Sequence, residues 1–337
     1  MDGQTEHQGM TAQNWMAHIE DVFLGRWTNP ATGQLSPRSA CEKILIADDL
    51  SGHEADLVSE VGVTGHIALV ADPDTWDALG GRVAKALGSV KPTDIVLGSH
   101  PHATLAEVDA VAKRLADFDA VVAVGSGTVN DLVKYVTAQE GRPYCVFGTA
   151  PSMDGYASTT ASMGLASGLK TSLPAHSPKG VFLDLGVLSA APPQLAAAGY
   201  GDTICGSVAR IDWWLSHRLL GTYYDDAPYL AAAPDAGRLE ANAVGVGQRD
   251  HNAIGWLTRA LVLSGLGVGF TGVSNSGSMG EQQISHYIDC FAGDRHPGTL
   301  HGEQVGLATL TMGRIQQALL NQSTPPKLRA TRLDADD

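Results

Sequence analysis

Residues 121–154, VVAVGSGTVNDLVKYVTAQEGRPYCVFGTAPSMD, decide the fold. The segment begins with a short Val-rich run typical of a buried strand and breaks at Gly125-Ser126-Gly127-Thr128. Apolar residues then recur at helical spacing, namely Val129, Leu132, Val133 and Val136. A second apolar run, 144–147, follows the Gly-Arg-Pro turn at 141–143. A strand, a helix and a second strand of these lengths form a βαβ unit, which predicts a parallel sheet.

The glycine turn between the first strand and the helix is a candidate phosphate-binding site. Glycines let the backbone approach a ligand closely, and the N–H groups at a helix start attract negative charge, so Gly125, Ser126 and Gly127 could bind a cofactor pyrophosphate. The turn lacks the six-position Gly-x-Gly-x-x-Gly pattern of dinucleotide-binding proteins. A tight turn without any ligand therefore stays an open alternative.

The remainder of the N-terminal half alternates strands and helices. Short apolar runs at 43–47 and 94–99 predict strands, and helical spacing is found at 13–24, 51–61 and 104–116. The segment HIALVADPDTWDALGGRVAKALG, 66–88, predicts a strand, an acidic turn and a helix. Asp72 ends that strand, where an acid can accept a hydrogen bond from a ribose hydroxyl, although it could equally cap the following helix. The alternation predicts an α/β domain with a parallel sheet.

The C-terminal half has a different pattern. Helix-compatible segments follow one another at 193–198, 202–220, 228–243, 252–266, 281–291 and 301–320. We therefore expect an α/β domain at 1–188, an all-α domain at 189–322 and a disordered tail at 323–337. The cleft between the two domains is the expected ligand site.

Composition limits the possible partners and compartments. The chain of 337 residues has a formal charge of −14, which argues against nucleic acid as a partner. No apolar run approaches the ~20 residues of a membrane span, and the N-terminus MDGQTEHQGMTAQNW lacks an export signal. Four scattered cysteines fit reduced thiols. These features predict a cytoplasmic protein without membrane insertion.

Carboxylate, imidazole and amide side chains stand at three places in the helical half. Asp202 follows Gly-Tyr-Gly where a helix is expected to begin, Gln282 and His286 are four residues apart on one helix face, and His301 starts another helix. Asp and His from separate helices can hold a divalent cation and leave a position open for substrate. Each residue also has a plain alternative, since Asp202 and His301 could be helix caps and His286 an ordinary histidine.

Two further residues could reach a ligand. Asp154 follows the strand at 144–147 and so lies at the same sheet edge as the glycine turn, although it could simply stabilise a Pro-Ser-x-Asp-Gly turn. Lys170 is a possible phosphate partner or a solvated surface lysine.

Six motifs carry a family resemblance. The chain from about residue 17 to 320 resembles the sn-glycerol-1-phosphate dehydrogenases, within the superfamily of iron-containing alcohol dehydrogenases and glycerol dehydrogenases, whose fold is similar to that of dehydroquinate synthase. The motifs occur in the family's order: GSGTVNDLVKY at 125–135, GTAPSMDGYAS at 148–158, GVFLDLGVL at 180–188, GYGD at 199–202, ISHYID at 284–289 and LHGEQVG at 300–306.

The resemblance implies an activity and its cofactors. It implies NAD(P)-dependent reduction of dihydroxyacetone phosphate to sn-glycerol 1-phosphate at a divalent metal, with zinc expected first and nickel or iron as alternatives. The expected partner is a small phosphorylated ketone or polyol, and the chain is a candidate homo-oligomer. NAD versus NADP preference stays open.

The resemblance also assigns roles to residues. Cofactor-binding positions are Asp72, Gly125, Ser126, Gly127, Asp131, Thr149 and Ser152. Metal-binding positions are Asp202, Gln282 and His301. Asp154 and His286 are expected to be catalytic and to bind substrate together with Lys170, and an imidazole with an unperturbed pKa near 6.5 suits proton transfer at neutral pH.

One position departs from the family pattern. Relatives carry Gly-Glu-His before Ile-Ser-His, whereas this chain has Gly280-Glu281-Gln282. An amide carbonyl suits zinc less well than an imidazole does. Two alternatives remain: a dehydrogenase for another polyol or phosphorylated ketone, since the motifs do not fix the carbon skeleton of the substrate, and a nucleotide-binding homologue whose metal site is impaired by Gln282.

Overall fold

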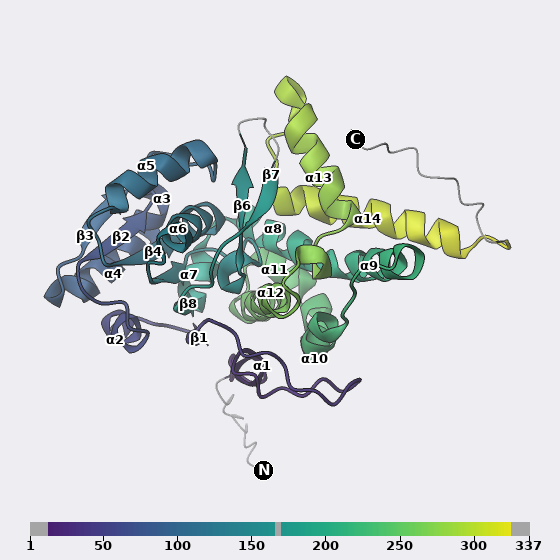
Figure 1. The fold of residues 1–337 in the computed structure, drawn as a ribbon, viewed down its shortest axis with the longest axis horizontal. Helices are drawn as coiled ribbons and strands as arrows, with labels where there is room; N and C mark the ends of the chain where they lie inside the picture. Colours follow the sequence, from purple (N-terminus) through teal and green to yellow (C-terminus); the bar gives the residue numbers. More distant parts are fainter. Residues whose placement is uncertain (1–12, 166–169, 325–337) are drawn as a thin grey trace, which may run out of the picture.

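A computed structural model describes residues 13–165 and 170–324 of the chain (Figure 1). Most of the expected tail at 323–337 lies outside the described residues, so that expectation stays a prediction. The α/β half and the helical half lie side by side, with the hairpin of β6 (Thr160–Gly164) and β7 (Lys170–Pro174) between them.

Six parallel strands form the main sheet in the order β1-β8-β5-β4-β2-β3. The four inner strands are buried along their whole length, which explains their continuous apolar sequence. The bounds are β1 Lys43–Ala47, β2 Ile67–Ala71, β3 Thr93–Val96, β4 Ala120–Gly125, β5 Tyr144–Gly148 and β8 Gly180–Asp184. The predicted parallel sheet and its central βαβ unit, β4-α6-β5, are confirmed.

Helices cover both faces of this sheet. One face packs on α2 and α4, and the other on α5, α6 and the long helix α12 (His251–Thr271). The bounds in this half are α1 Ile19–Phe23, α2 Glu54–Glu60, α3 Pro73–Thr75, α4 Gly81–Ala86, α5 Leu105–Leu115, α6 Gly127–Glu140 and α7 Leu185–Ala190. A π-helical turn, Trp76–Gly80, joins α3 to α4. The helix expected over 13–24 is only five residues long.

The helical half contains the long helices that the sequence predicts. They are α8 Pro193–Ile204, α9 Gly206–Leu220, α10 Ala227–Ala241, α11 Ala243–Gln248, α12 His251–Thr271, α13 Gly280–Phe291 and α14 His301–Leu320. Short 3-10 turns lie at Leu87–Ser89, Gly155–Ala157, Ser274–Ser276 and Gly293–Arg295.

The expected helix start at Asp202 is wrong, because α8 continues through it. Gly199 and Gly201, which resemble a helix break in the sequence, lie inside α8. A Cβ on Gly199 would come within 1.9 Å of the Pro151 carbonyl oxygen, and one on Gly201 within 2.1 Å of the Gly302 carbonyl oxygen. These glycines therefore serve close helix packing, and Asp202 lies in the last turn of α8 instead of capping its start.

The antiparallel hairpin of β6, Thr160–Gly164, and β7, Lys170–Pro174, was not anticipated from the sequence. Its strands are short and half-buried, so they lack the apolar runs of the main sheet. Lys170 begins β7, and β7 contacts α13.

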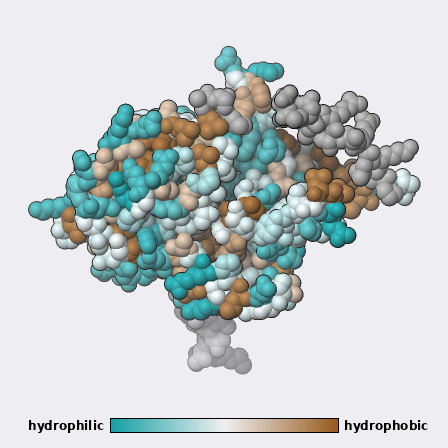
Figure 2. Space-filling view, in the orientation of Figure 1, coloured by the Kyte–Doolittle hydropathy of each residue, from teal (hydrophilic) through white to brown (hydrophobic). Residues whose placement is uncertain are grey.

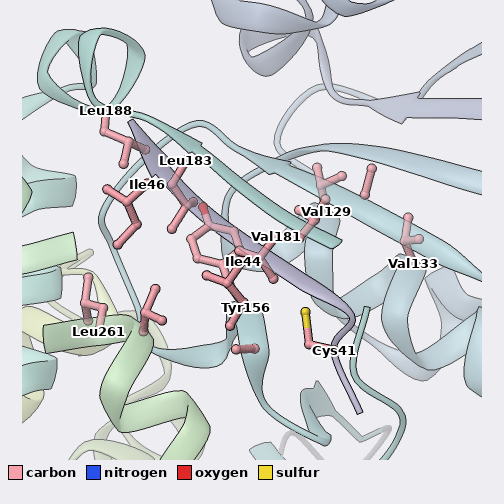
Figure 3. Close-up of a cluster of buried hydrophobic side chains, with 14 of the residues drawn as sticks. Cys41, Ile44, Ile46, Val129, Val133, Tyr156, Val181, Leu183, Leu188 and Leu261 are labelled. Carbon is pink, nitrogen blue, oxygen red and sulfur yellow. The ribbon is translucent and has the colours of Figure 1, made fainter. Parts of the chain in front are cut away.

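The two halves share one hydrophobic core. Figure 3 shows strand residues such as Ile44, Val181 and Leu183 beside Leu261 of α12. Of the described helices, α12 alone is long and apolar enough to cross a membrane, but 78% of its apolar window is buried inside the protein. α12 is therefore the central helix of the core. The division into domains 1–188 and 189–322 stays a prediction.

Exposed hydrophobic side chains gather at the outer ends of α9 and α14. They include Leu219 and Leu220 of α9 and Leu319 and Leu320 of α14. Figure 2 shows brown surface at the outer end of the helical half. Contiguous apolar surface is often a contact site between proteins. Such a surface is consistent with the expected homo-oligomer, which stays a prediction.

Candidate active site

A cavity of about 520 Å³ lies at the carboxyl edge of the sheet and is lined by residues from both halves of the chain. Its walls come from the start of α6, the loop after β5, the β6–β7 hairpin, and the helices α8, α13 and α14. Most of the sequence-predicted residues line it: Ser126, Gly127, Asp131, Ser152, Asp154, Lys170, Asp202, Gln282, His286 and His301. Asp72, Gly125 and Thr149 do not.

The glycine turn places the start of α6 at the cavity wall. Ser126 precedes the helix in an extended conformation, with φ −101° and ψ −152°, and no side chain caps the helix start. A Cβ on Gly125 would lie 2.5 Å from the Val129 Cβ, so only glycine allows the turn to be this tight. The N-terminus of a 14-residue helix thus presents backbone N–H groups at the cavity, as an anion site requires.

Gly125 and Thr149 do not line the cavity but hold the glycine turn in place through backbone hydrogen bonds. The Thr149 backbone N–H donates to the Gly125 carbonyl oxygen at 3.1 Å. The Tyr156 hydroxyl contacts the same carbonyl oxygen at 3.2 Å and that of Ala150 at 3.0 Å. These bonds hold the ends of β4 and β5 together. Contact of Gly125 or Thr149 with a cofactor stays a prediction.

Asp72 is a helix cap in this structure. Its Oδ1 accepts from the Thr75 backbone N–H at 2.8 Å, and the Thr75 hydroxyl accepts from the Asp72 N–H at 3.0 Å. Asp72 still follows β2, the neighbour of β4, at the carboxyl edge of the sheet. Its second carboxylate oxygen could therefore meet a ribose, and that role stays a prediction.

Asp131 and Lys134 form a buried pair under the cavity, and the sequence analysis missed Lys134. Lys134 is fully buried and donates to the carbonyl oxygens of Gly155 and Thr160 and to the Ser158 hydroxyl. Asp131 accepts from the Ser162 N–H at 3.1 Å. Burial raises the pKa of Asp131, although Lys134 opposes the shift. A charged residue among the apolar positions of α6 was the available signal.

Two carboxylates lie side by side at the floor of the cavity. The Asp154 backbone N–H donates to Asp202 Oδ2 at 3.3 Å, and the Asp154 Oδ2 accepts from the Ser264 hydroxyl at 2.7 Å. Burial, followed by the neighbouring Asp154, raises the pKa of Asp202 to about 8. Burial also raises the pKa of Asp154. Both shifts favour the protonated carboxyl groups, because the described residues bring too little positive charge to offset burial. Nothing in the sequence pointed to Ser264.

Gln282 and His301 complete this group from α13 and α14. The Gln282 Nε2 lies 3.4 Å from Asp202 Oδ1, and the ring centroids of His301 and His286 are 5.6 Å apart. Burial lowers the pKa of His301 to about 3, and burial followed by the charge of Lys170 lowers the pKa of His286. Both imidazoles are therefore neutral at pH 7. The pKa of His286 thus lies below the ordinary imidazole value near 6.5, because the ring is partly buried near a lysine, and its role in proton transfer stays a prediction.

The donor set fits a divalent cation. No three His, Cys, Asp or Glu side chains of residues 13–165 and 170–324 are grouped as a metal site. Asp202 and His301 nevertheless supply a carboxyl oxygen, which becomes anionic when a cation displaces its proton, and a neutral ring nitrogen, and the Gln282 amide supplies a third, weaker donor. A cation would also balance the raised-pKa carboxylates. The roles of all three residues stay predictions.

Comparison with known proteins places this arrangement in a class. Residues 45–192 match the family described as iron-containing alcohol dehydrogenase. The glycerol dehydrogenase of Schizosaccharomyces pombe superposes with a TM-score of 0.67 at 21% identity, over 85% of this chain and 72% of that one. A probable glycerol dehydrogenase from Sinorhizobium meliloti gives 0.65 at 24% identity, over 80% and 75%. The fold is that of these dehydrogenases.

Sequence relatives define the family more closely. The chain is 31% identical to the glycerol-1-phosphate dehydrogenase [NAD(P)+] of Thermococcus kodakarensis, over 80% of this chain and 76% of the relative. It is 30% identical to that of Methanocorpusculum labreanum, over 78% and 73%. The chain therefore belongs to the glycerol-1-phosphate dehydrogenase family, and it is an oxidoreductase.

Proposed function

We propose that this chain reduces dihydroxyacetone phosphate to sn-glycerol 1-phosphate with NADH or NADPH and a divalent metal. One observation carries the proposal. An open helix N-terminus, a carboxylate–imidazole group and a lysine face the same cavity of about 520 Å³. A pyridine nucleotide, a cation and a phosphorylated ketone need these three features respectively.

We further propose that the protein works in the cytoplasm.

The proposed cofactor site runs along the carboxyl edge of β4 and β2. The start of α6 at Ser126 and Gly127 would bind the pyrophosphate, and Asp72 would accept from a ribose hydroxyl. Ser152 and Asp154 follow β5 and would border the nicotinamide. The nicotinamide supplies the hydride, so the protein's part is to orient it.

The proposed metal site consists of Asp202, Gln282 and His301. When bound, a divalent cation supplies Lewis-acid polarisation of the ketone oxygen, with zinc our first choice and nickel or iron as alternatives. The chain prepares this site by keeping His301 neutral and Asp202 buried. Asp154, held by Ser264, fixes the loop through its backbone hydrogen bond to Asp202.

His286 is the proposed route for the proton. Its ring stacks beside that of His301 and lines the cavity. Because its pKa is lowered, it is neutral at pH 7 and acts by passing a proton from water to the product oxygen, since little imidazolium is present.

Lys170 is the proposed phosphate partner. It is the only Lys or Arg among the described residues that line the cavity. A charged hydrogen bond of this kind contributes about 1.5–3 kcal/mol, or roughly ten- to two-hundredfold in affinity.

The test compares two ketones in a nicotinamide oxidation assay with metal-loaded protein. We expect a kcat/KM at least about tenfold higher for dihydroxyacetone phosphate than for dihydroxyacetone. Lys170→Met should remove most of this preference by raising KM for the phosphorylated ketone alone. Equal use of both ketones would favour the alternative of another polyol dehydrogenase. Cofactor binding without any turnover in every metal would favour the impaired homologue that Gln282 suggests.

A further inference from the structure

We propose that Ser285, Gln304 and Asp289 are positioning residues that fix the tautomer of His301. They form a continuous series of hydrogen bonds that keeps the ring proton of His301 on Nδ1. The unprotonated Nε2 is then free to bind a divalent cation. The inference deepens the proposed function and rests on it for the identity of that cation. The hydrogen-bond chain itself is a property of the metal-free protein.

The series of hydrogen bonds starts at Asp289, near the end of α13. Burial would raise the pKa of Asp289, but the hydrogen bonds from His296 and Gln304 outweigh it and the pKa is lowered. The carboxylate is therefore ionised and can only accept. His296 is oriented as a donor, because its Nδ1 accepts from the Gly298 N–H at 3.0 Å and its Nε2 lies 3.0 Å from Asp289 Oδ1.

Asp289 in turn orients the amide of Gln304 on α14. The Gln304 Nε2 donates to Asp289 Oδ1 at 3.2 Å and lies 3.5 Å from the Thr299 carbonyl oxygen. Both of these partners are acceptors, so the amide nitrogen must face them. The His296 Nε2 also lies 3.2 Å from the Gln304 Nε2, but its own proton is directed to Asp289, so it takes no hydrogen bond from the amide. The Gln304 Oε1 then faces Ser285 Oγ at 2.8 Å.

Ser285 transmits this orientation to His301. A hydroxyl has a single proton, and that of Ser285 is directed to Gln304 Oε1. The Ser285 Oγ can then only accept from His301 Nδ1, which lies 2.9 Å away. His301 must consequently carry its proton on Nδ1. Its Nε2 is left unprotonated, which is the state a metal ligand requires.

Because these hydrogen-bonded side chains are buried, the direction of each hydrogen bond is fixed. Ser285 is 0% exposed and Gln304 is 6% exposed, so water does not readily replace either partner. Reversing one hydrogen bond would leave a buried donor or acceptor unsatisfied, at a cost of about 1–3 kcal/mol. The sequence analysis did not single out any of the three residues, although ISHYID and LHGEQVG contain them.

The experiment measures the His301 tautomer by ¹⁵N NMR of the metal-free protein at pH 7.5, with the signal assigned through a His301→Gln variant. We expect the Nδ1–H form in the wild type. Gln304→Leu removes the acceptor of the Ser285 proton, so that proton can turn to His301 Nδ1 and the Nε2–H form should become dominant. Ser285→Ala should give a mixture of both tautomers.

Zinc affinity, measured by calorimetry, is the second readout. Gln304→Leu and Ser285→Ala should weaken zinc binding by roughly ten- to hundredfold. Thr309→Val is the matched control, because Thr309 is a buried hydroxyl on the same helix, and within the described part of the chain it bonds only the Val305 carbonyl oxygen. It should change neither the tautomer nor the zinc affinity.

An Nε2–H tautomer in the wild type would overturn the proposal by itself, even if neither Gln304→Leu nor Ser285→Ala folds. A Gln304→Leu protein that folds with the Nδ1–H form intact would also overturn it. This outcome can be distinguished from failure of the proposed reaction. If only the proposed reaction is wrong, the protein would show the expected tautomers and zinc affinities without reducing dihydroxyacetone phosphate.

Discussion

Gln282 is the residue at which this chain departs from the family pattern, and the structure places it at the proposed metal site. Its side chain is buried and its amide nitrogen lies 3.4 Å from Asp202 Oδ1. To offer its carbonyl oxygen to a cation, the amide must rotate by half a turn and give up this contact. The position is therefore the weakest part of the donor set.

Gln282→His should tighten zinc binding by about tenfold or more, because imidazole is a better ligand for zinc than an amide oxygen. Calorimetric titration measures the change, and activity should rise with it. Gln283→His places the new imidazole on the exposed neighbouring position and is the control. If Gln282→His changes nothing while His286→Ala abolishes binding, then His286 is the third ligand.

The raised pKa of Asp202 predicts how zinc affinity depends on pH. Because the carboxyl group has a pKa of about 8, it holds a proton at neutral pH that a cation must displace. Zinc affinity should rise by up to about tenfold per unit between pH 6 and 8. His301, with a pKa of about 3, adds no dependence in this range. A flat profile would show that Asp202 is ionised or is not a ligand.

The same shift affects the stability of the metal-free protein. The folded carboxyl group binds its proton more tightly than the unfolded one, whose pKa is 3.8. Its contribution to the free energy of unfolding is therefore fully present below about pH 4 and is lost as the pH rises through about 8. Denaturant titrations of wild type and Asp202→Asn at pH 6 and 8 measure it, and the variant should lose this part of the pH dependence.

At the scale of elements, the packing of α8 on α14 brings Asp202 and His301 together. A Cβ on Gly201 would meet the Gly302 carbonyl oxygen at 2.1 Å, and one on Gly302 would meet the Ala198 carbonyl oxygen at 2.1 Å. The two helices can approach this closely only because both positions lack a side chain. Each glycine is adjacent in sequence to a proposed ligand, so the packing and the site depend on the same residues.

Gly201→Ala should separate the two helices, destabilise the protein by about 1–3 kcal/mol and weaken zinc binding. Gly313→Ala on α14 is the control, because its Cβ would have only an ordinary contact of 3.9 Å with Val208. That change should be neutral or stabilising by up to about 1 kcal/mol, as expected for alanine in a helix. Denaturant unfolding and calorimetry measure both effects. Wild-type zinc affinity in Gly201→Ala would contradict this account of the helix contact.

Elements with strong local patterns could be predicted from the sequence, and those defined by long-range contacts could not. The strand at 43–47 and the helix at 301–320 match the structure, because their apolar periodicity and ends are local. The Gly-Tyr-Gly-Asp motif was misplaced at a helix start, since only α14 and the Pro151 loop explain its glycines. The β6–β7 hairpin was missed because its strands are short and half-buried.

The candidate site shows the same limit. Residues in recognisable motifs, such as Asp154 and His301, do line the cavity. The partners that orient them come from distant segments: Ser264 on α12 bonds Asp154 across 110 residues, and Gln304 bonds Ser285 across 19. Spacing in the sequence contains no signal for such contacts. The direction of a pKa shift is equally hidden, because burial depends on the whole fold.

At the scale of the whole molecule, one core cluster extends through both halves. It contains Val121 and Val181 of the sheet together with Leu257 and Leu261 of α12. Removing α12 would therefore expose the part of this face of the sheet that α5 and α6 do not cover. Domains that share a core of this kind unfold together, whereas domains with separate cores can unfold one by one.

We therefore expect β4 and α12 to exchange their backbone amides with the same free energy of opening, close to that of global unfolding, in metal-free protein. Zinc or NADH at one hundred times its Kd should raise both values by about 2.7 kcal/mol, because a ligand of the folded state stabilises every segment that unfolds with its site. Hydrogen exchange followed by mass spectrometry resolves the two segments. If zinc protected α12 and left β4 unchanged, the helical half would be an independent domain, as the sequence division at residue 188 implies.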